Sequence, residues 1–181
     1  DRKFKQNIQG ALANGIQVGI YFYSGATDAK TAYDEASFCI NLIKDYQITY
    51  PVAFDWELDG DYNSVTEACE TFCNVIKSYG YQPMVYSNRN RWYNNFNGEK
   101  LSNKFKVWMA AYWSEYYYTS TRWTYGDDLA SFKWHYDMWQ YGVTDTVDGI
   151  DGYVDMNIAF FGYANYKVNG AQDAALTVTN T

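Results

Sequence analysis

The chain has 181 residues and a formal net charge of −7 at pH 7, from 21 acidic and 14 basic side chains. This length suits one domain with its own core and leaves little room for a second. The acidic balance argues against nucleic acid or an anionic membrane surface as a partner. No apolar run reaches the length of about 18 residues that a membrane span requires.

Aromatic residues are the main peculiarity of the composition. The chain contains 20 Tyr, 10 Phe and 7 Trp, which together make up 20% of its residues. Rings at this density exceed what packing requires, so we expect some of them to line a surface for a partly apolar, partly hydroxylated ligand such as a sugar. The alternative is a tyrosine-rich core and surface without a ligand.

The cysteines predict neither a disulfide scaffold nor a metal site. Cys39, Cys69 and Cys73 are few and odd in number, and His135 lies far along the chain from them. We therefore expect buried free thiols, no metal and no cofactor. A single bridge between Cys39 and one of the other two remains an alternative in a secreted protein.

Helices and strands alternate through the first half of the chain. Helices are predicted from Arg2 to Asn14, from Asp28 to just before Pro51, and from Ser64 to Tyr79, where Ser64 and Glu67 match a capping box. The residues expected to face the core are Phe4, Ile8, Ala11 and Leu12, then Tyr33, Ala36, Ile40 and Ile43, then Ala68, Phe72, Val75, Ile76 and Tyr79. Strands are predicted at Ile16 to Tyr23, Pro51 to Glu57 and Pro83 to Asn88.

These strands recur about every 32 residues, which is the spacing of a strand plus a crossover helix. Such units predict a parallel sheet, either closed as a barrel or open and doubly wound. Further strands are predicted more closely spaced, at Lys106 to Tyr112, Tyr136 to Tyr141 and Tyr153 to Ala159. Asn94 to Asn103 and Tyr116 to Asp128 are expected to be loops or broken helices. The domain is expected to cover residues 1–164, and residues 165–181 to form a linker or the start of another module.

The sequence Pro51 to Glu57 delivers two carboxylates at the end of an apolar run. In a strand, Asp55 and Glu57 point to the same face with Cα atoms roughly 6.5 Å apart. A run this apolar suits a buried parallel strand, and the carboxyl ends of such strands are where α/β folds place their chemistry. Paired carboxylates in different environments suit glycoside hydrolysis. The alternative is a solvated strand end without a catalytic role.

Other predicted strands also end in polar or aromatic groups that packing does not require. These residues are Tyr86, Asn88, Trp108, Tyr112, Trp139, Gln140, Tyr141, Asp155 and Asn157. Several strands that end this way predict a ring of side chains at one face, as in the active site of a barrel.

The order of short motifs resembles that of family 25 glycoside hydrolases, the Chalaropsis-type lysozymes or 1,4-β-N-acetylmuramidases. The motifs are G-x-Y at 19–21, D-x-E at 55–57, Y-x-N at 86–88, W-x-A-x-Y at 108–112, W-Q-Y at 139–141 and V-D-x-N at 154–157. The resemblance runs from Asp1 to about Tyr163. It implies an irregular TIM-like (β/α) barrel with fewer than eight helices. It also implies cleavage of the β-1,4 bond between N-acetylmuramic acid and N-acetylglucosamine in peptidoglycan, by a secreted bacterial or phage-encoded endolysin at the cell wall.

The resemblance also implies roles for individual residues. Glu57 would be the general acid, with Asp55 and Asp155 as companion carboxylates that raise its proton affinity. The expected sugar contacts are Tyr21, Tyr86, Asn88, Trp108, Tyr112, Trp139, Gln140, Tyr141 and Asn157. Participation of the substrate's acetamido oxygen is the favoured course, while direct displacement by a carboxylate and attack by an activated water stay open.

The sequence departs from the family pattern in two places. Phe22 stands where members often have histidine, and nothing matches the family's first-strand aspartate in a D-x-S motif. We therefore expect six of eight barrel strands, with a gap between strands 16–23 and 153–159. That gap would be open, filled by residues 165–181 or covered by a neighbouring molecule, and lysis would be weak or nil.

Two other functions are compatible with an aromatic barrel. One is a catalytically inert barrel that only binds glycans, although three converging carboxylates would be costly in a pure binder. The other is a chitinase-like barrel, but the D-x-x-D-x-D-x-E order that it requires is absent here.

Overall fold

The computed structural model describes residues 1–112 and 130–161. In chain order the elements are α1 (Phe4–Ala13), β1 (Ile20–Tyr23), α2 (Ala29–Ile43), β2 (Val52–Asp55), α3 (Tyr62–Ser78), β3 (Pro83–Asn88), α4 (Arg89–Asn94), α5 (Gly98–Ser102), β4 (Lys106–Ala110), β5 (Met138–Asp145) and β6 (Val154–Ala159). The loop expected at Tyr116 to Asp128, the tail from residue 165 and the domain boundary at 164 lie outside the described residues.

The strands form one mixed sheet in the order β1-β2-β3-β4-β5-β6. Neighbours from β1 to β5 pair in parallel, as the recurring βα spacing predicted. The prediction of a parallel sheet is wrong for β6, which pairs antiparallel with β5. The connection of residues 146–153 is too short to hold a crossover helix, so the chain can only turn back as a hairpin.

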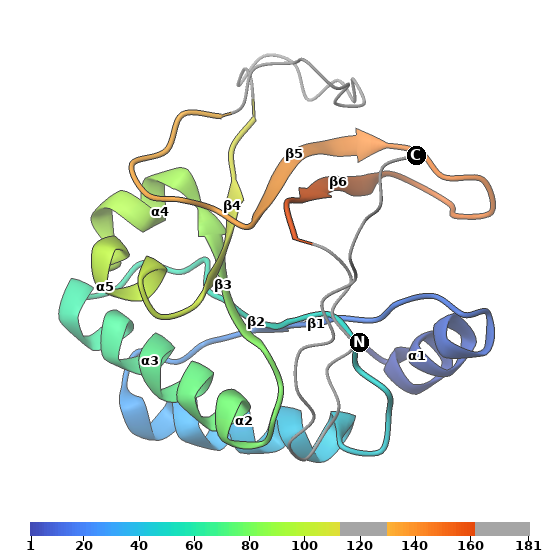
Figure 1. Cartoon of the computed structure of the whole chain (residues 1–181), viewed down its shortest axis with the longest axis horizontal. Coiled ribbons are helices and arrows are strands. Elements are labelled where there is room, and N and C mark those ends of the chain that lie inside the picture. The colour runs from blue at the N-terminus through green and yellow to red at the C-terminus, as the bar shows by residue number, and fades with distance from the viewer. Residues whose placement is uncertain (113–129, 162–181) are drawn as a thin grey trace.

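The sheet curls but does not close within the described residues. β1 and β6 occupy the two ends of the strand order and do not pair with each other. Figure 1 shows β1 in the lower part of the molecule and β6 in the upper part. This arrangement agrees with the gap expected between these two strands.

Helices α2 and α3 lie side by side on the outer face of the sheet (Figure 1). The core fills the space between them and the strands, and it includes the fully buried Phe54, Trp56, Phe72 and Trp139. The face of the sheet opposite α2 and α3 is called the inner face below. Most of the predicted helical stripes are buried, but Tyr33 and Tyr79 are 56% and 52% exposed, because they lie at the margins of their stripes, where a tyrosine hydroxyl reaches water.

The helix boundaries follow local capping chemistry. The predicted cap Asp28 is confirmed, since its Oδ1 accepts a hydrogen bond from the Thr31 amide at 2.8 Å. The capping box at Ser64 is wrong: α3 begins earlier, and Asp61 accepts from the amides of Asn63 and Ser64, both at 3.1 Å. Gly80 ends the same helix with a φ of +85°, a conformation that glycine adopts without strain.

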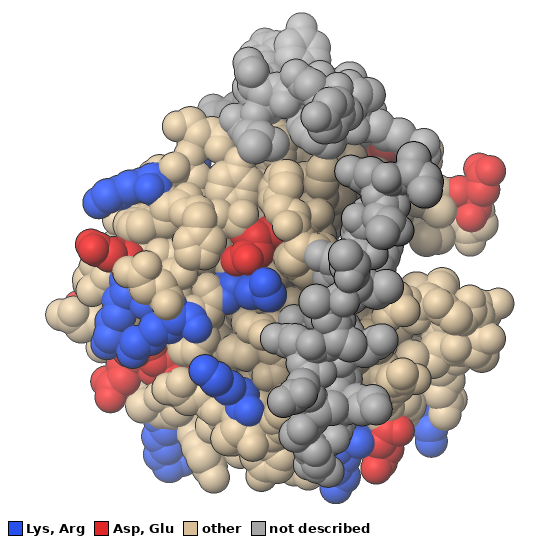
Figure 2. Space-filling model, viewed as in Figure 1, with Lys and Arg blue, Asp and Glu red and all other residues tan. Residues whose placement is uncertain are grey.

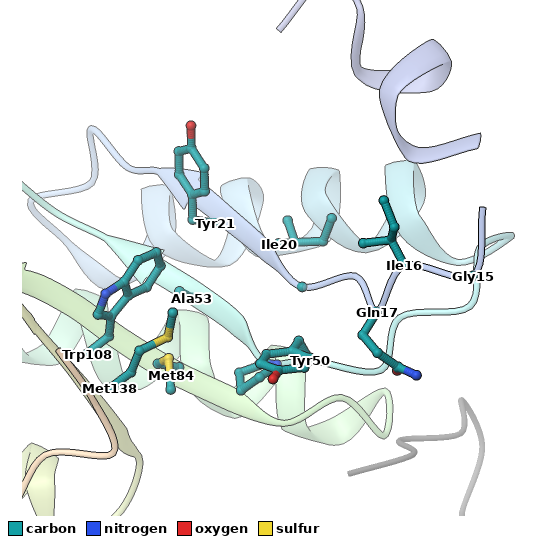
Figure 3. A pocket seen from close by; sticks show the side chains of 12 residues that line it. Gly15, Ile16, Gln17, Ile20, Tyr21, Tyr50, Ala53, Met84, Trp108 and Met138 are labelled. Atoms are coloured by element: carbon teal, nitrogen blue, oxygen red, sulfur yellow. The ribbon is translucent and has the colours of Figure 1, made fainter. Parts of the chain in front are cut away.

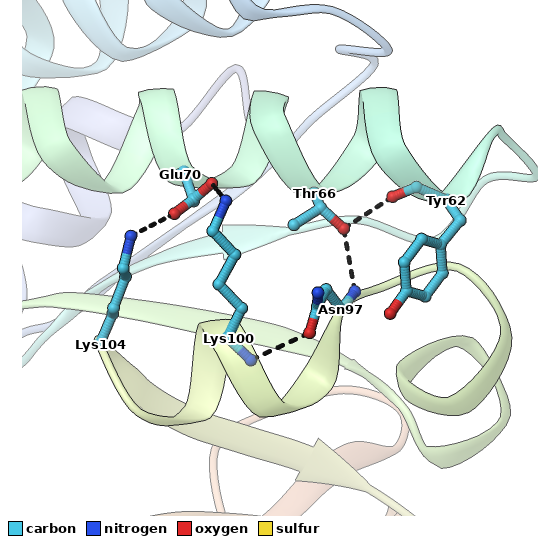
Figure 4. Close-up of polar contacts among 6 residues, drawn as sticks. All are labelled: Tyr62, Thr66, Glu70, Asn97, Lys100 and Lys104. Carbon is cyan, nitrogen blue, oxygen red and sulfur yellow. Dashed lines mark hydrogen bonds and ion pairs between the residues drawn. The ribbon is translucent and has the colours of Figure 1, made fainter.

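The region after β3 resolves into the short helices α4 and α5, the second of which docks on α3 (Figure 4). Thr66 Oγ1 accepts from the Asn97 amide at 2.9 Å. Glu70 pairs with Lys100 and Lys104, each at 2.5 Å. Partial burial opposes ionisation of Glu70, but hydrogen bonds from the two lysines outweigh it and hold the pKa of Glu70 below its usual value.

The charges and thiols of the described residues suggest no further chemistry. On the face seen in Figure 2, basic side chains are interspersed with acidic ones instead of forming a patch of one sign. Cys39, Cys69 and Cys73 are buried and free, as predicted.

No helix in the described ranges is long and apolar enough to cross a membrane. The same ranges contain no cluster of three or more His, Cys, Asp or Glu side chains suited to a metal ion.

Candidate active site

The alternation of side chains along β2 sets the position of the two carboxylates. Phe54 and Trp56 are fully buried in the core on the helix side of the sheet. Because successive strand residues point to opposite faces, Asp55 lies on the inner face. Glu57 continues this alternation two residues on, just past the end of β2, and its charge acts on Asp55.

The backbone that carries Glu57 is held by side chains from neighbouring elements. Ser87 Oγ donates to the Trp56 carbonyl oxygen at 2.7 Å, and the Trp56 indole donates to the Ala26 carbonyl oxygen at 3.1 Å. One residue beyond Glu57, Arg91 Nε donates to the Leu58 carbonyl oxygen at 2.9 Å. Sequence reasoning missed Ser87 and Arg91. The one signal in the sequence was Trp56 itself: it lies between two acids, so its side chain must point to the opposite face, where it can anchor this segment of backbone.

The two acids differ in their environment. The Asp55 side chain is buried at 6% exposure, and its Oδ1 has no hydrogen-bond partner among the described residues. Burial, and secondarily the charge of Glu57, raises the pKa of Asp55 to about 7. The resemblance implied that the neighbouring carboxylates raise the proton affinity of Glu57. In the structure the pKa of Asp55 is raised, and burial is the main cause.

Three predicted site residues form one hydrogen-bond network on the inner face. Tyr86 donates its hydroxyl to Gln140 Oε1 at 2.8 Å, and Tyr112 donates to the same oxygen at 2.7 Å. Tyr86 is 8% exposed and Gln140 is 4% exposed. Burial, followed by the charges of nearby groups and a hydrogen bond with Glu57, raises the pKa of Tyr86 far above its usual value. The charges that act on Tyr86 include those of Glu57 and Asp55, so the network lies near both carboxylates.

Trp108, Asn157 and Asp155 complete the inner face near the acids. The Trp108 indole donates to Asn157 Oδ1 at 2.8 Å, and its ring meets the Tyr86 ring edge-on with centroids 4.7 Å apart. Asn157 pairs with Gln140 across the antiparallel ladder. Because β6 runs antiparallel, its exposed Asp155 lies toward the edge of the sheet at which the parallel strands end. The hairpin thus brings Asp155 to the same edge as Asp55.

Three predicted sugar contacts pack on the helix side of the sheet or accept a hydrogen bond from the protein's own backbone. Trp139 is fully buried in the core on the helix side and donates its indole N–H to the Ala111 carbonyl oxygen at 2.8 Å. Tyr141 packs beside it, with ring centroids 5.8 Å apart. Asn88 caps α4 by accepting from the Arg91 amide at 3.0 Å. Strand alternation explains the placement of Trp139 and Tyr141, because the residues on either side of Gln140 must face away from it.

Tyr21 lies apart from the acids, at the edge of a cavity of about 520 Å³ (Figure 3). Trp108, Met84 and Met138 approach this cavity from neighbouring strands, and Ala53 forms part of its wall. Neither Asp55 nor Glu57 lines it. Ala53 precedes Asp55 by two residues on the same face, so the cavity continues the inner face away from the carboxylates.

A sequence model described as glycosyl hydrolases family 25 matches residues 1–150 of the chain. A D-alanyl-L-alanine endopeptidase of Streptococcus phage B30 is 26% identical over 157 residues, which cover 84% of this chain and 33% of that protein.

Two solved structures extend the similarity to the fold. The CTP1L endolysin is 26% identical with a TM-score of 0.69, over 88% of this chain and 52% of that chain. The autolysin LytC of Streptococcus pneumoniae is 25% identical with a TM-score of 0.68, over 87% of this chain and 37% of that chain. LytC has also been solved in complex with a synthetic peptidoglycan ligand. The chain spans only a third to about half the length of these relatives.

Proposed function

The chain belongs to the family 25 glycosyl hydrolases, and from this premise we propose that it hydrolyses the β-1,4 bond between N-acetylmuramic acid and N-acetylglucosamine in bacterial peptidoglycan. The peptidoglycan ligand bound by LytC supports this substrate class. The names of the endolysin and autolysin relatives support a site of action at the bacterial cell wall. The proposed fold is an irregular (β/α) barrel, supported by the parallel strands β1 to β5 with helices on their outer face.

Glu57 is the proposed general acid, which protonates the leaving glycosidic oxygen. Its half-buried position at the end of β2 leaves it accessible to a substrate on the inner face. Asp55 and Asp155 are the proposed companion carboxylates, which orient the acetamido group so that its oxygen attacks the anomeric carbon. Above a pH of about 7, where Asp55 is ionised, its carboxylate can accept a hydrogen bond from the acetamido N–H and so strengthen the oxygen as a nucleophile.

The observation that carries this proposal is the pairing of a buried and a half-buried carboxylate on one face of one strand. Glycoside hydrolysis uses two carboxyl groups in distinct roles, and their different burial distinguishes Asp55 from Glu57. Tyr86, Trp108 and Tyr112 lie on the same face and offer ring surfaces and hydroxyls to sugars. Gln140 and Asn157 add amide groups beside them.

Purified peptidoglycan incubated with the chain tests the proposal. We expect new reducing ends with N-acetylmuramic acid at the terminus, and none with the Glu57→Gln variant. Reducing ends at N-acetylglucosamine would contradict the proposed bond. Tight binding to peptidoglycan without new reducing ends would favour the inert glycan-binding alternative.

A further inference from the structure

We propose that side chains on and beside the short helix α4 clamp the loop of residues 56–60, and that Arg91 on this helix is a positioning residue for Glu57. This inference deepens the proposed function, because it rests on Glu57 as the general acid. It assigns α4 the task of fixing a segment of backbone that lies past the end of the β2–β3 ladder.

The ladder between β2 and β3 ends just before the general acid. Its last pair is Asp55 opposite Tyr86, and a backbone bond from the Trp56 amide to the Tyr86 carbonyl oxygen at 3.3 Å extends it by one step. Glu57 follows, at the level where β3 has ended and α4 begins at Arg89. A catalytic group must keep its place to within roughly 0.5 Å, so this loop needs another support.

Three side-chain donors hold the loop beyond the ladder, and they bind every second carbonyl group. The bonds run from Ser87 Oγ to the Trp56 carbonyl oxygen at 2.7 Å, from Arg91 Nε to that of Leu58 at 2.9 Å, and from Asn95 Nδ2 to that of Gly60 at 3.1 Å. Arg91 and Asn95 are four residues apart and therefore lie on one side of the helix. That side of α4 faces the loop and follows it from one carbonyl to the next.

The far end of the loop is also fixed by packing. Gly60 returns so close to the Trp56 ring that a Cβ atom at this position would lie 3.1 Å from the ring and 2.8 Å from the Val65 side chain. The Trp56 ring is fully buried and cannot give way easily. Both ends of the loop are thus held, and Arg91 holds its middle, one residue after Glu57.

The Arg91 bond acts on Glu57 through the backbone. Ser87 fixes the peptide group before Glu57, and Arg91 fixes the peptide group after Leu58, so little rotation remains to the backbone between them. Loss of the Arg91 bond should let the Glu57 carboxyl move away from the leaving oxygen while the glycan-binding surface stays intact. Such a change lowers kcat and leaves KM unchanged.

Arg91→Gln and Arg91→Met form a matched pair that tests the bond itself. Glutamine carries an amide nitrogen on Cδ, the same atom that carries Nε in arginine, so it can donate from the same place. Methionine is similar in length and has no donor, and all three residues have similar helix propensities.

We expect kcat for the release of reducing ends to fall by about 10- to 100-fold in Arg91→Met, with KM unchanged. Arg91→Gln should restore most of the lost activity. Asn94→Ala removes a bond to Asn90 on the exposed side of α4 and should behave like the wild type. Equal losses in the two Arg91 variants would overturn the proposal, because they would point to the charge of Arg91 and not to its bond with Leu58.

Backbone nitrogen relaxation measured by NMR tests the clamp without requiring turnover. Order parameters of the Glu57 and Leu58 amides should fall from a rigid value of about 0.85 toward about 0.6 in Arg91→Met, and stay close to the wild-type values in Arg91→Gln. Unchanged order parameters in Arg91→Met would overturn the clamp. A mobile loop with wild-type kcat would overturn the positioning role.

Asn95→Ala provides a second variant, which removes the outer bond of the clamp. The order parameter of the Gly60 amide should fall in this variant, and kcat should fall with it. If Arg91→Met does not fold, Asn95→Ala and Arg91→Gln decide by the same criteria.

Turnover of the wild type separates this inference from the proposed function. If the wild type releases no reducing ends from peptidoglycan, the proposed function fails, while the order parameters still decide whether α4 fixes the loop. If the wild type releases them and Arg91→Met is equally active, the inference fails and the proposed function stands.

Discussion

Asp55 and Glu57 share one face of β2 and its continuation, yet Asp55 is 6% exposed whereas Glu57 is only half-buried. The backbone places the two acids together by simple alternation. Their difference follows from their places in the sheet, because Asp55 lies in the ladder opposite Tyr86 while Glu57 lies beyond the last ladder residue. Because Asp55 is buried, its ionisation lowers the stability of the folded protein.

Asp55→Asn should stabilise the protein at alkaline pH. Folding raises the pKa of Asp55 from 3.8 to about 7, so between these values the folded state holds a proton that the unfolded state has lost. Stability therefore falls as pH rises through this window, by up to about 4 kcal/mol. Urea unfolding should show the variant more stable than the wild type at pH 8 and nearly equal to it at pH 4. Asp59→Asn, at an exposed position, should change neither value.

Glu57→Gln should reduce the release of reducing ends by about 100-fold or more, because it removes the proton donor and keeps the shape. Thermal stability and glycan binding should stay close to wild type. Glu67→Gln on the exposed side of α3 is the matched control and should remain fully active. Equal activity of the two variants would refute the assignment of Glu57.

Trp108→Ala should weaken glycan binding, whereas Trp139→Ala should lower stability. Trp108 lies on the inner face, so its loss should weaken glycan binding by roughly 1 to 3 kcal/mol, by analogy with stacked bases. Trp139 is fully buried, so its loss should lower the free energy of unfolding by about 3 to 5 kcal/mol. Melting and binding curves measured on each variant separate the two effects. A folded Trp139→Ala protein with wild-type stability and weakened binding would restore Trp139 to the glycan site.

Ser87→Ala should loosen the backbone that carries Glu57. The Ser87 hydroxyl is buried and donates to the Trp56 carbonyl oxygen, so its loss should cost about 1 kcal/mol of stability and lower turnover. Ser78→Ala removes a hydroxyl that donates to a carbonyl at an exposed site on α3 and should change neither. Turnover of Ser87→Ala equal to that of the control would mean that this bond does not position the acid.

Glu70→Gln should destabilise the contact between α3 and α5. Glu70 is largely buried beneath Lys100 and Lys104, so losing two charge-assisted bonds should lower stability by about 1 to 3 kcal/mol. Asp34→Asn disrupts the exposed pair with Lys30 and should cost less than about 0.5 kcal/mol. Thermal unfolding of both variants measures the difference. Equal losses would show that burial of Glu70 has no energetic consequence.

Local patterns in the sequence sufficed for much of the fold. The strand Pro83–Asn88 and the Asp28 cap were predicted as the structure has them, because each depends on neighbouring residues alone. The same period-2 alternation placed Asp55 and Glu57 on one face before any tertiary contact was known. Helix α4 was not predicted from the sequence, and a loop or broken helix was expected at Asn94 to Asn103, which contains α5, since neither helix is long enough to show a hydrophobic stripe.

Tertiary structure decided which of the predicted site residues can act together. The sequence alone showed that Trp139, Gln140 and Tyr141 form a motif, but pairing of β5 with its neighbours turned Gln140 to the inner face and Trp139 into the core. Asp155 reaches the edge near Asp55 only because β6 turns back antiparallel, a choice made by a short connection. The raised pKa of Asp55 also depends on burial by residues distant in sequence. Periodicity is local and can be read from one strand, whereas burial and strand direction arise only when the strands are packed together.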